Sequence, residues 1–123
     1  TTFGGNPLAC AVAEQVMTLL TKKTLLNGVK KKEKIFLKEL KSINDDYQCF
    51  SAIRSSGLWI GCKLNVTENF NLDTVMKACY EKGLMILKAN DNTIRLAPSL
   101  IIEDDLILKG LKILRAVIQE QHP

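Results

Sequence analysis

The sequence has no long hydrophobic run and no closely spaced cysteines. Its apolar stretches are short and interrupted by charge, so none can span a bilayer, and the first residues lack the basic start and apolar core of a signal peptide. We therefore expect a cytoplasmic protein without a membrane partner. The cysteines lie far apart in apolar contexts, without the close pairs of a zinc site or a redox motif. We predict no bound metal and reduced core thiols at Cys10, Cys49, Cys62 and Cys79.

Basic residues outnumber acidic ones and give the chain a net charge of +4. Much of this excess comes from one lysine-rich stretch in which Phe36 is the only aromatic residue. A nucleic-acid-binding surface needs arginine and aromatic side chains interleaved on one face, so we expect no nucleic-acid partner. The stretch instead predicts a solvated helix face. Its lysines are Lys22, Lys23, Lys30, Lys31, Lys32, Lys34 and Lys38.

The length of 123 residues suits one domain with its own core and leaves no room for a second full domain. Hydrophobic residues make up 46% of the chain and charged residues 24%, which is ordinary for a globular protein and excludes a disordered one. Neither an internal repeat nor a low-complexity segment interrupts the sequence.

The first half of the chain changes from helical to strand periodicity. Apolar residues at helical spacing predict an amphipathic helix over residues 7 to about 21. A second stripe, from Leu26 to Ile43, predicts another helix. Residues 50–54 form a short strand candidate, and the alternation over 58–64 is typical of a half-buried strand. A hairpin through 55–57 is expected to join them.

The second half repeats the change of period. Asn71 can cap a helix that reaches Lys82, and Gly83 can adopt the left-handed conformation that ends it. Residues 84–87 and 93–97 are predicted to be strands joined by a turn at Asn90, Asp91 and Asn92.

Three acidic residues, Glu103, Asp104 and Asp105, favour the start of a final helix through its dipole. The predicted order is therefore helix, helix, strand, strand, helix, strand, strand, helix. This order indicates an α/β (α+β) fold with a small, mainly antiparallel sheet and helices on one face. Fold alone does not determine function.

A cluster of hydroxyls and glycines occupies residues 1–7. Gly4 and Gly5 leave the backbone free of side-chain bulk, so a ligand can approach closely, and such a segment can meet a phosphate. Asn6 and Pro7 are favoured cap and first-turn residues. From these residues alone, a phosphate-binding segment and a simple capped helix start both remain open.

Arg95 is the second candidate functional residue. It lies between Ile94 and Leu96, just before Pro98, in a predicted strand. The planar fork of guanidinium donors suits a ligand carboxylate held by two parallel hydrogen bonds. A structural ion pair with an acidic side chain is an equal alternative on this reasoning.

Four segments together resemble one family. Residues 1–13 (TTFGGNPLACAVA), 53–61 (IRSSGLWIG), 82–87 (KGLMIL) and 94–102 (IRLAPSLII) follow, in order, motifs of the class III pyridoxal-phosphate aminotransferases. The resemblance is strongest to the acetylornithine and succinylornithine aminotransferases. It extends through the whole chain.

The resemblance implies roles for three residues. Thr2 would hydrogen-bond the phosphate of pyridoxal 5'-phosphate (PLP) bound to the partner subunit of a homodimer, Thr1 would touch the amino-acid substrate, and Arg95 would hold the substrate carboxylate. It also implies that residues 1–21 are an interdomain helix with the phosphate-binding segment. Residues 22–123 would be the C-terminal small domain of a fold-type I PLP enzyme.

The same resemblance implies an incomplete site. The Schiff-base lysine, the acid that pairs with the ring nitrogen and the aromatic stacking partner have no family context in this chain. We therefore expect a C-terminal piece of a longer enzyme, with no catalytic residue of its own and no activity or bound cofactor when alone. Lys22 and Lys23 are poor alternatives as nucleophiles, because they are expected at solvent-facing positions of a helix.

The implied reaction belongs to arginine metabolism: transfer of the terminal amino group of N-acetylornithine or N-succinylornithine to 2-oxoglutarate. Ornithine and 4-aminobutyrate aminotransferases are alternatives within the class. A non-catalytic regulatory module that binds a carboxylate metabolite through Arg95, and an interaction domain with a lysine-rich helix, are alternatives outside it.

Two residues near the hairpin carry further expectations. Arg54 is interpreted as structural, held by an ion pair or a backbone contact rather than used in catalysis. Ser55 replaces a glycine of the family motif, so the turn is expected to be strained if that position needs a positive φ angle.

Overall fold

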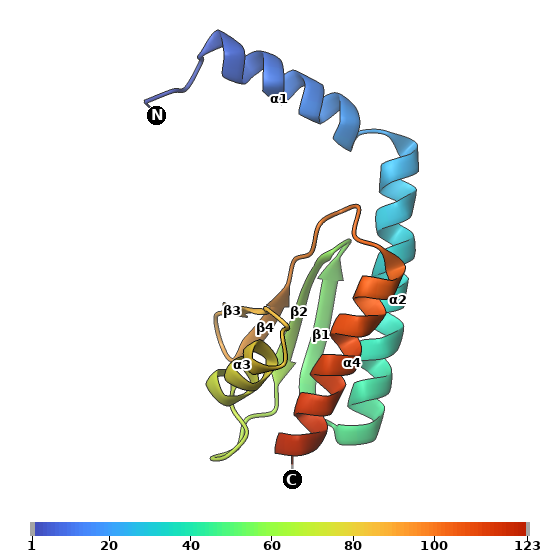
Figure 1. Cartoon of the computed structure of the whole chain (residues 1–123), viewed down its shortest axis with the longest axis vertical. Coiled ribbons are helices and arrows are strands. Elements are labelled where there is room, and N and C mark those ends of the chain that lie inside the picture. Colours follow the sequence, from blue (N-terminus) through green and yellow to red (C-terminus); the bar gives the residue numbers. More distant parts are fainter. Residues whose placement is uncertain (1, 123) are drawn as a thin grey trace.

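The chain folds around a four-stranded antiparallel sheet with helices on one of its faces (Figure 1). The computed structural model describes residues 2–122. Strand order is β1-β2-β4-β3, and each neighbouring pair is antiparallel. This architecture confirms the predicted α/β (α+β) class. The elements in chain order are α1 (Pro7–Leu20), α2 (Lys23–Tyr47), β1 (Phe50–Ser56), β2 (Trp59–Leu64), α3 (Leu72–Glu81), β3 (Leu87–Ala89), β4 (Thr93–Leu96) and α4 (Asp104–Gln121).

Helix α1 is present as predicted, but it projects from the rest of the chain (Figure 1). Its first turn is capped by the Asn6 side chain, which accepts hydrogen bonds from the N–H groups of Leu8 and Ala9. The apolar stripe of this amphipathic helix is exposed, because within residues 2–122 no element covers it. Its exposed members include Leu8, Val12, Val16 and Leu19.

Helix α2 supports the fold with its C-terminal half. Phe36, Leu40 and Ile43 are buried, whereas Leu26 in its first turns is exposed. Most lysines of the lysine-rich stretch are exposed, which confirms the predicted solvated face. The helix ends at Gln48, whose left-handed backbone (φ 51°) turns the chain into β1.

The sheet has one buried and one exposed face, as the alternation in β2 predicted. Ile60, Cys62 and Leu64 join the core formed with α2, α3 and α4. The side chains of Trp59 and Lys63, between them, are exposed. Because opposite residues of antiparallel strands face the same side, the register extends this exposed face across all four strands.

The β1–β2 hairpin turns at Gly57, whose φ is +60°. A Cβ atom there would lie 2.9 Å from Cγ1 of Val29, so the close approach of α2 also requires glycine. Ser55 does not have a positive φ, so the expected strain at that residue is absent. Its hydroxyl instead donates to Glu33 Oε1 at 2.6 Å, and the Gly57 N–H donates to the same oxygen at 3.1 Å.

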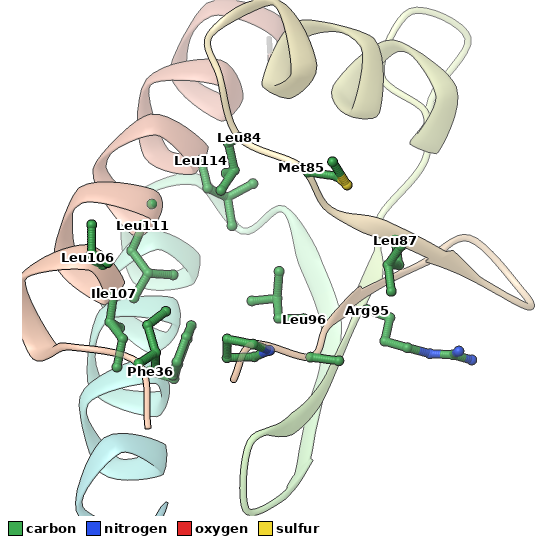
Figure 2. A pocket seen from close by; sticks show the side chains of 14 residues that line it. Phe36, Leu84, Met85, Leu87, Arg95, Leu96, Leu106, Ile107, Leu111 and Leu114 are labelled. Atoms are coloured by element: carbon green, nitrogen blue, oxygen red, sulfur yellow. The ribbon is translucent and has the colours of Figure 1, made fainter. Parts of the chain in front are cut away.

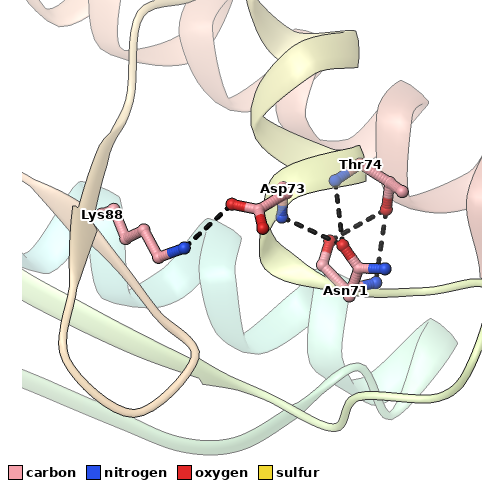
Figure 3. Close-up of polar contacts among 4 residues, drawn as sticks. All are labelled: Asn71, Asp73, Thr74 and Lys88. Carbon is pink, nitrogen blue, oxygen red and sulfur yellow. Dashed lines mark hydrogen bonds and ion pairs between the residues drawn. The ribbon is translucent and has the colours of Figure 1, made fainter.

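Helix α3 has the predicted cap. The Asn71 side chain accepts from the N–H groups of Asp73 and Thr74, and the Thr74 hydroxyl accepts from the Asn71 N–H (Figure 3). Asp73 also pairs with Lys88 of β3 at 2.9 Å, which joins the start of the helix to the edge of the sheet. At the other end, Gly83 is left-handed as expected (φ +81°).

The third strand lies later than the sequence predicted. Residues 84–87 were expected to form it, but β3 begins at Leu87 and pairs with β4 only through Ala89. The Leu84 N–H donates to Cys79 O at 2.8 Å and so closes the end of α3 instead of joining a strand ladder. The turn at 90–92 is confirmed in its position.

Helix α4 completes the core. Its predicted stripe is buried: Ile107, Leu111, Leu114 and Ile118. Arg115 ties α4 to α2, since its guanidinium contacts the Asp46 carboxylate and donates to Ser42 Oγ at 2.8 Å. This ion pair helps to raise the pKa of Arg115 above its usual value.

Three of the four cysteines are buried, and one expectation is wrong. Cys10 is exposed because it lies on α1, whereas Cys49, Cys62 and Cys79 belong to the core. All four are free thiols. Burial raises the pKa of the three core thiols from 9.0, to about 11 for Cys49 and Cys79 and about 12 for Cys62.

Candidate functional site

Arg95 lies in the middle of the exposed sheet face. The register places it opposite Gly61 on one side and Leu87 on the other, and Gly61 in turn lies opposite Arg54. These four residues form one row across the sheet. The strand β4 is an interior strand, so the backbone of Arg95 is fixed from both sides while its side chain remains half-buried.

The Arg95 guanidinium has no acidic partner among residues 2–122. Neither an ion pair nor a hydrogen bond joins it to another described side chain, so the structural ion pair considered from the sequence is absent there. Its one side-chain partner is aromatic: Cζ lies 5.0 Å from the ring centroid of Trp59. The guanidinium N–H donors are thus available to an external acceptor such as a carboxylate.

An apolar cleft of about 310 Å³ adjoins the stem of Arg95. Figure 2 shows apolar side chains on one side of this cleft and the Arg95 guanidinium extending away from them. The end of the side chain is therefore directed to the exposed face rather than into the cleft. The apolar lining includes Phe36, Leu84, Leu96, Ile107, Leu111 and Leu114.

Arg54, at the β1 end of the row, does not make the structural contact that the sequence predicted. It is exposed and makes neither an ion pair nor a side-chain hydrogen bond with any residue in the 2–122 range, so the predicted structural contact is absent. It lines a second cleft, of about 260 Å³, with Lys63 and Thr93. Lys63 is paired with Asp91, which neutralises one of the cations on this face.

Thr2 lies near the N-terminus, before α1, and not on the exposed face of the sheet. It is exposed, and its hydroxyl has no hydrogen bond to any described residue. The N–H groups of the first turn of α1 are already used, two by the Asn6 side chain and that of Cys10 by Asn6 O. A phosphate would therefore meet the Thr2 hydroxyl and the glycine-rich segment rather than the helix terminus.

Within one chain, Thr2 and Arg95 are not brought together. Helix α1 has 14 residues, which makes it roughly 21 Å long, and it carries the segment around Thr2 away from the sheet (Figure 1). Thr1, the predicted substrate contact, lies outside the described residues.

Sequence reasoning missed Trp59. The alternation of β2 placed it with Gly61 and Lys63 on one face, and this signal was present in the sequence. Its proximity to Arg95 depends on β2 pairing with β4, which periodicity does not specify. No group of three or more metal-binding side chains occurs in residues 2–122, and no helix there is long and apolar enough to cross a membrane.

Comparison with known proteins identifies the family. The model of the class III aminotransferase family matches residues 1–118. The acetylornithine/succinyldiaminopimelate aminotransferase of Buchnera aphidicola (subsp. Acyrthosiphon pisum, strain APS) is 45% identical over 112 residues, or 91% of this chain and 28% of that protein. The succinylornithine transaminase of Yersinia pestis is 44% identical over 120 residues, or 98% of this chain and 29% of that protein.

A solved structure agrees with these sequence matches. The crystal structure of the acetylornithine aminotransferase from Elizabethkingia anophelis is 31% identical, with a TM-score of 0.84 over 98% of this chain and 30% of that one. The chain therefore belongs to the class III aminotransferase family, which confirms the resemblance seen in its motifs. It spans less than a third of the length of these relatives.

Proposed function

We propose that this chain is the C-terminal part of a PLP-dependent transaminase that moves the terminal amino group of N-acetylornithine or N-succinylornithine to 2-oxoglutarate. The names of the relatives support acyl-ornithine substrates, and one of them adds succinyldiaminopimelate as a further acyl-diamine. Residues 22–123 would form the small domain, and residues 1–21 the interdomain helix with its phosphate-binding segment.

The observation that carries this proposal is the unpaired Arg95 guanidinium on a rigid interior strand. No acidic side chain in the described part of the chain accepts hydrogen bonds from the Arg95 guanidinium. A ligand carboxylate could accept two of them in parallel. Both substrates of the proposed reaction, the acyl-ornithine and 2-oxoglutarate, carry such a carboxylate. The regulatory-module alternative is not favoured, because the matched family is a family of aminotransferases.

The residues around Thr2 fit the phosphate of PLP. The hydroxyl is exposed and without a partner, and a Cβ atom built on Gly5 would meet nothing within 4 Å. The bound cofactor would supply an electron sink for carbanion chemistry. Thr2 would donate a hydrogen bond to its phosphate, and the separation of Thr2 from Arg95 favours a contact with the cofactor of the partner subunit in a homodimer.

The proposal is tested with the full-length protein and PLP. We expect amino transfer from N-acetylornithine or N-succinylornithine to 2-oxoglutarate, faster than from ornithine or 4-aminobutyrate. Replacement of Arg95 by leucine should cost about 2 to 5 kcal/mol of carboxylate binding, seen as a large rise in KM. The matched control is Arg54→Leu on the same row, which should change KM little.

Cofactor binding has its own test. Thr2→Val should lower the affinity for PLP, measured by cofactor release during dialysis, because a phosphate acceptor loses its donor. Thr18→Val, in the helix that follows Thr2 and with its hydroxyl bonded to Glu14 O, is the control. Unchanged PLP affinity in the Thr2 variant would refute the phosphate contact, and absence of amino transfer from every substrate named above would refute the proposed function.

A further inference from the structure

Trp59 and Arg95 form a diagonal pair across strands β2 and β4. Ile60 lies opposite Leu96 and Gly61 opposite Arg95, so Trp59 is two positions along β2 from the residue that faces Arg95. Diagonal neighbours on one face of an antiparallel pair are within reach of aromatic and long side chains. The distance of 5.0 Å from the guanidinium carbon to the indole centroid lies in the range of a cation–π interaction.

Gly61 places no side chain directly opposite Arg95. A Cβ atom on Gly61 would lie 3.3 Å from Cγ2 of Thr93, which is on the side of Gly61 away from Trp59. The glycine therefore leaves Arg95 free to lean toward Trp59.

The other charged groups of this face do not hold Arg95. Arg54, in the same row, has the same sign and lies two strands away, at a backbone separation of about 10 Å. Lys63 is also a cation, and Asp91, the acid near this face, is paired with it. Among the described residues, the indole of Trp59 is thus the side chain that orients the Arg95 guanidinium.

Trp59 has no other evident structural use. Its side chain is 60% exposed, so it adds little to the buried core, although a large aromatic surface in water is unfavourable. An indole face binds a guanidinium without using its N–H donors, because the attraction comes from the ring quadrupole. The stacked arginine keeps its hydrogen-bonding edge for a ligand.

We propose that Trp59 is a positioning residue for substrate binding: it holds the Arg95 guanidinium ready to receive the carboxylate of the amino donor or of the keto acid. This proposal rests on the proposed function, because it assigns Arg95 the substrate carboxylate. An arginine that is already oriented loses less side-chain freedom when the ligand binds, so the pair increases affinity without touching the reacting atoms.

The test compares KM with kcat in the full-length enzyme. Trp59→Leu should raise KM for the carboxylate substrates by about two- to five-fold, which corresponds to a cation–π contact at an exposed site, and should leave kcat nearly unchanged. Trp59→Phe keeps an aromatic face and should restore most of the affinity. Tyr80→Leu, which removes an aromatic side chain that is 72% exposed on α3, is the matched control and should leave both constants unchanged.

The outcomes separate the two proposals. If the enzyme without substitutions catalyses no amino transfer, the proposed function is refuted. An active enzyme in which Trp59→Leu leaves KM unchanged, or in which leucine and phenylalanine variants are equally impaired, refutes the positioning role alone. A fall in kcat at constant KM would also refute it, because positioning of the carboxylate affects binding.

A second measurement tests the contact itself in the 123-residue chain. Trp59 is its sole tryptophan, so intrinsic fluorescence excited at the indole reports on this one position. Arg95→Leu should change the emission maximum or intensity, whereas Lys77→Leu, at an exposed position of α3, should not, with circular dichroism to verify that both variants are folded. Identical spectra for the folded Arg95 variant and the unaltered chain would overturn the proposal.

Discussion

The carboxylate of Glu33 in α2 lies 2.6 Å from the hydroxyl of Ser55 in β1 and also accepts the N–H of Gly57. One glutamate thus fixes the hairpin that precedes Trp59. Glu33→Ala should lower the free energy of unfolding by about 1 to 2 kcal/mol, because two donors lose a charged acceptor. Urea denaturation would measure this. Glu39→Ala, on the same helix, removes a glutamate that makes no hydrogen bond or ion pair within residues 2–122 and should have a smaller effect.

Two glycines with positive φ separate the effect of backbone conformation from that of close packing. Gly57→Ala meets both an unfavourable φ and the Val29 side chain at 2.9 Å, whereas Gly83→Ala meets only the unfavourable φ. We expect the Gly83 variant to lose about 1 kcal/mol of stability and the Gly57 variant 1 to 3 kcal/mol more. Thermal unfolding would compare them. Equal losses of stability in the two variants would show that α2 can move away from the turn without a further loss of stability.

The caps of α3 and α1 are chemically alike but differ in what they stabilise. Asn71→Ala should lower global stability by about 1 kcal/mol, because α3 buries Val75 and Cys79 in the core. Asn6→Ala removes the same kind of cap from a helix with no buried residue. It should reduce helical content without changing the midpoint of chemical denaturation. A lowered midpoint in the Asn6 variant would show that α1 unfolds together with the core.

Alkaline pH should destabilise the fold through the core thiols. The pKa of Cys62 is raised from 9.0 to about 12 by burial, so the folded state keeps its proton where the unfolded state loses it. The stabilisation by this group is complete below pH 9 and is lost as the pH rises from 9 toward 12.

The measurement is the free energy of unfolding in urea at pH 8, 9.5 and 10.5. Cys62→Val removes the titrating thiol and should therefore give a shallower decline than the unaltered chain. Parallel declines would contradict the assignment.

The sequence could predict features that depend on neighbouring residues. Asn6 and Asn71 form the caps that their residue type favours, Gly83 ends its helix in the left-handed conformation, and the alternation around Ile60 identifies the two faces of β2. Each of these follows from local hydrogen bonding or from a period of two or 3.6 residues. The four motifs also predicted the class III aminotransferase family, which the comparisons confirm.

Features that depend on distant segments could not be predicted in this way. The stripe of α1 shows the period of a buried helix, but burial depends on what packs against it, and within residues 2–122 nothing does. The contact between Trp59 and Arg95 depends on the strand order that makes β2 and β4 neighbours. The late start of β3 depends on Leu84 closing the end of α3. Strand order and such closures are set by tertiary packing.

The projecting position of α1 has a consequence for the order in which the whole protein becomes structured. A helix of 14 residues without a packing partner is only marginally stable in water. Its amides should therefore exchange with deuterium far faster than those of α4, and become protected only when another surface covers its leucines and valines. The segment bearing Thr2, the proposed phosphate contact, would then be ordered by assembly and would be the last part of the molecule to become structured.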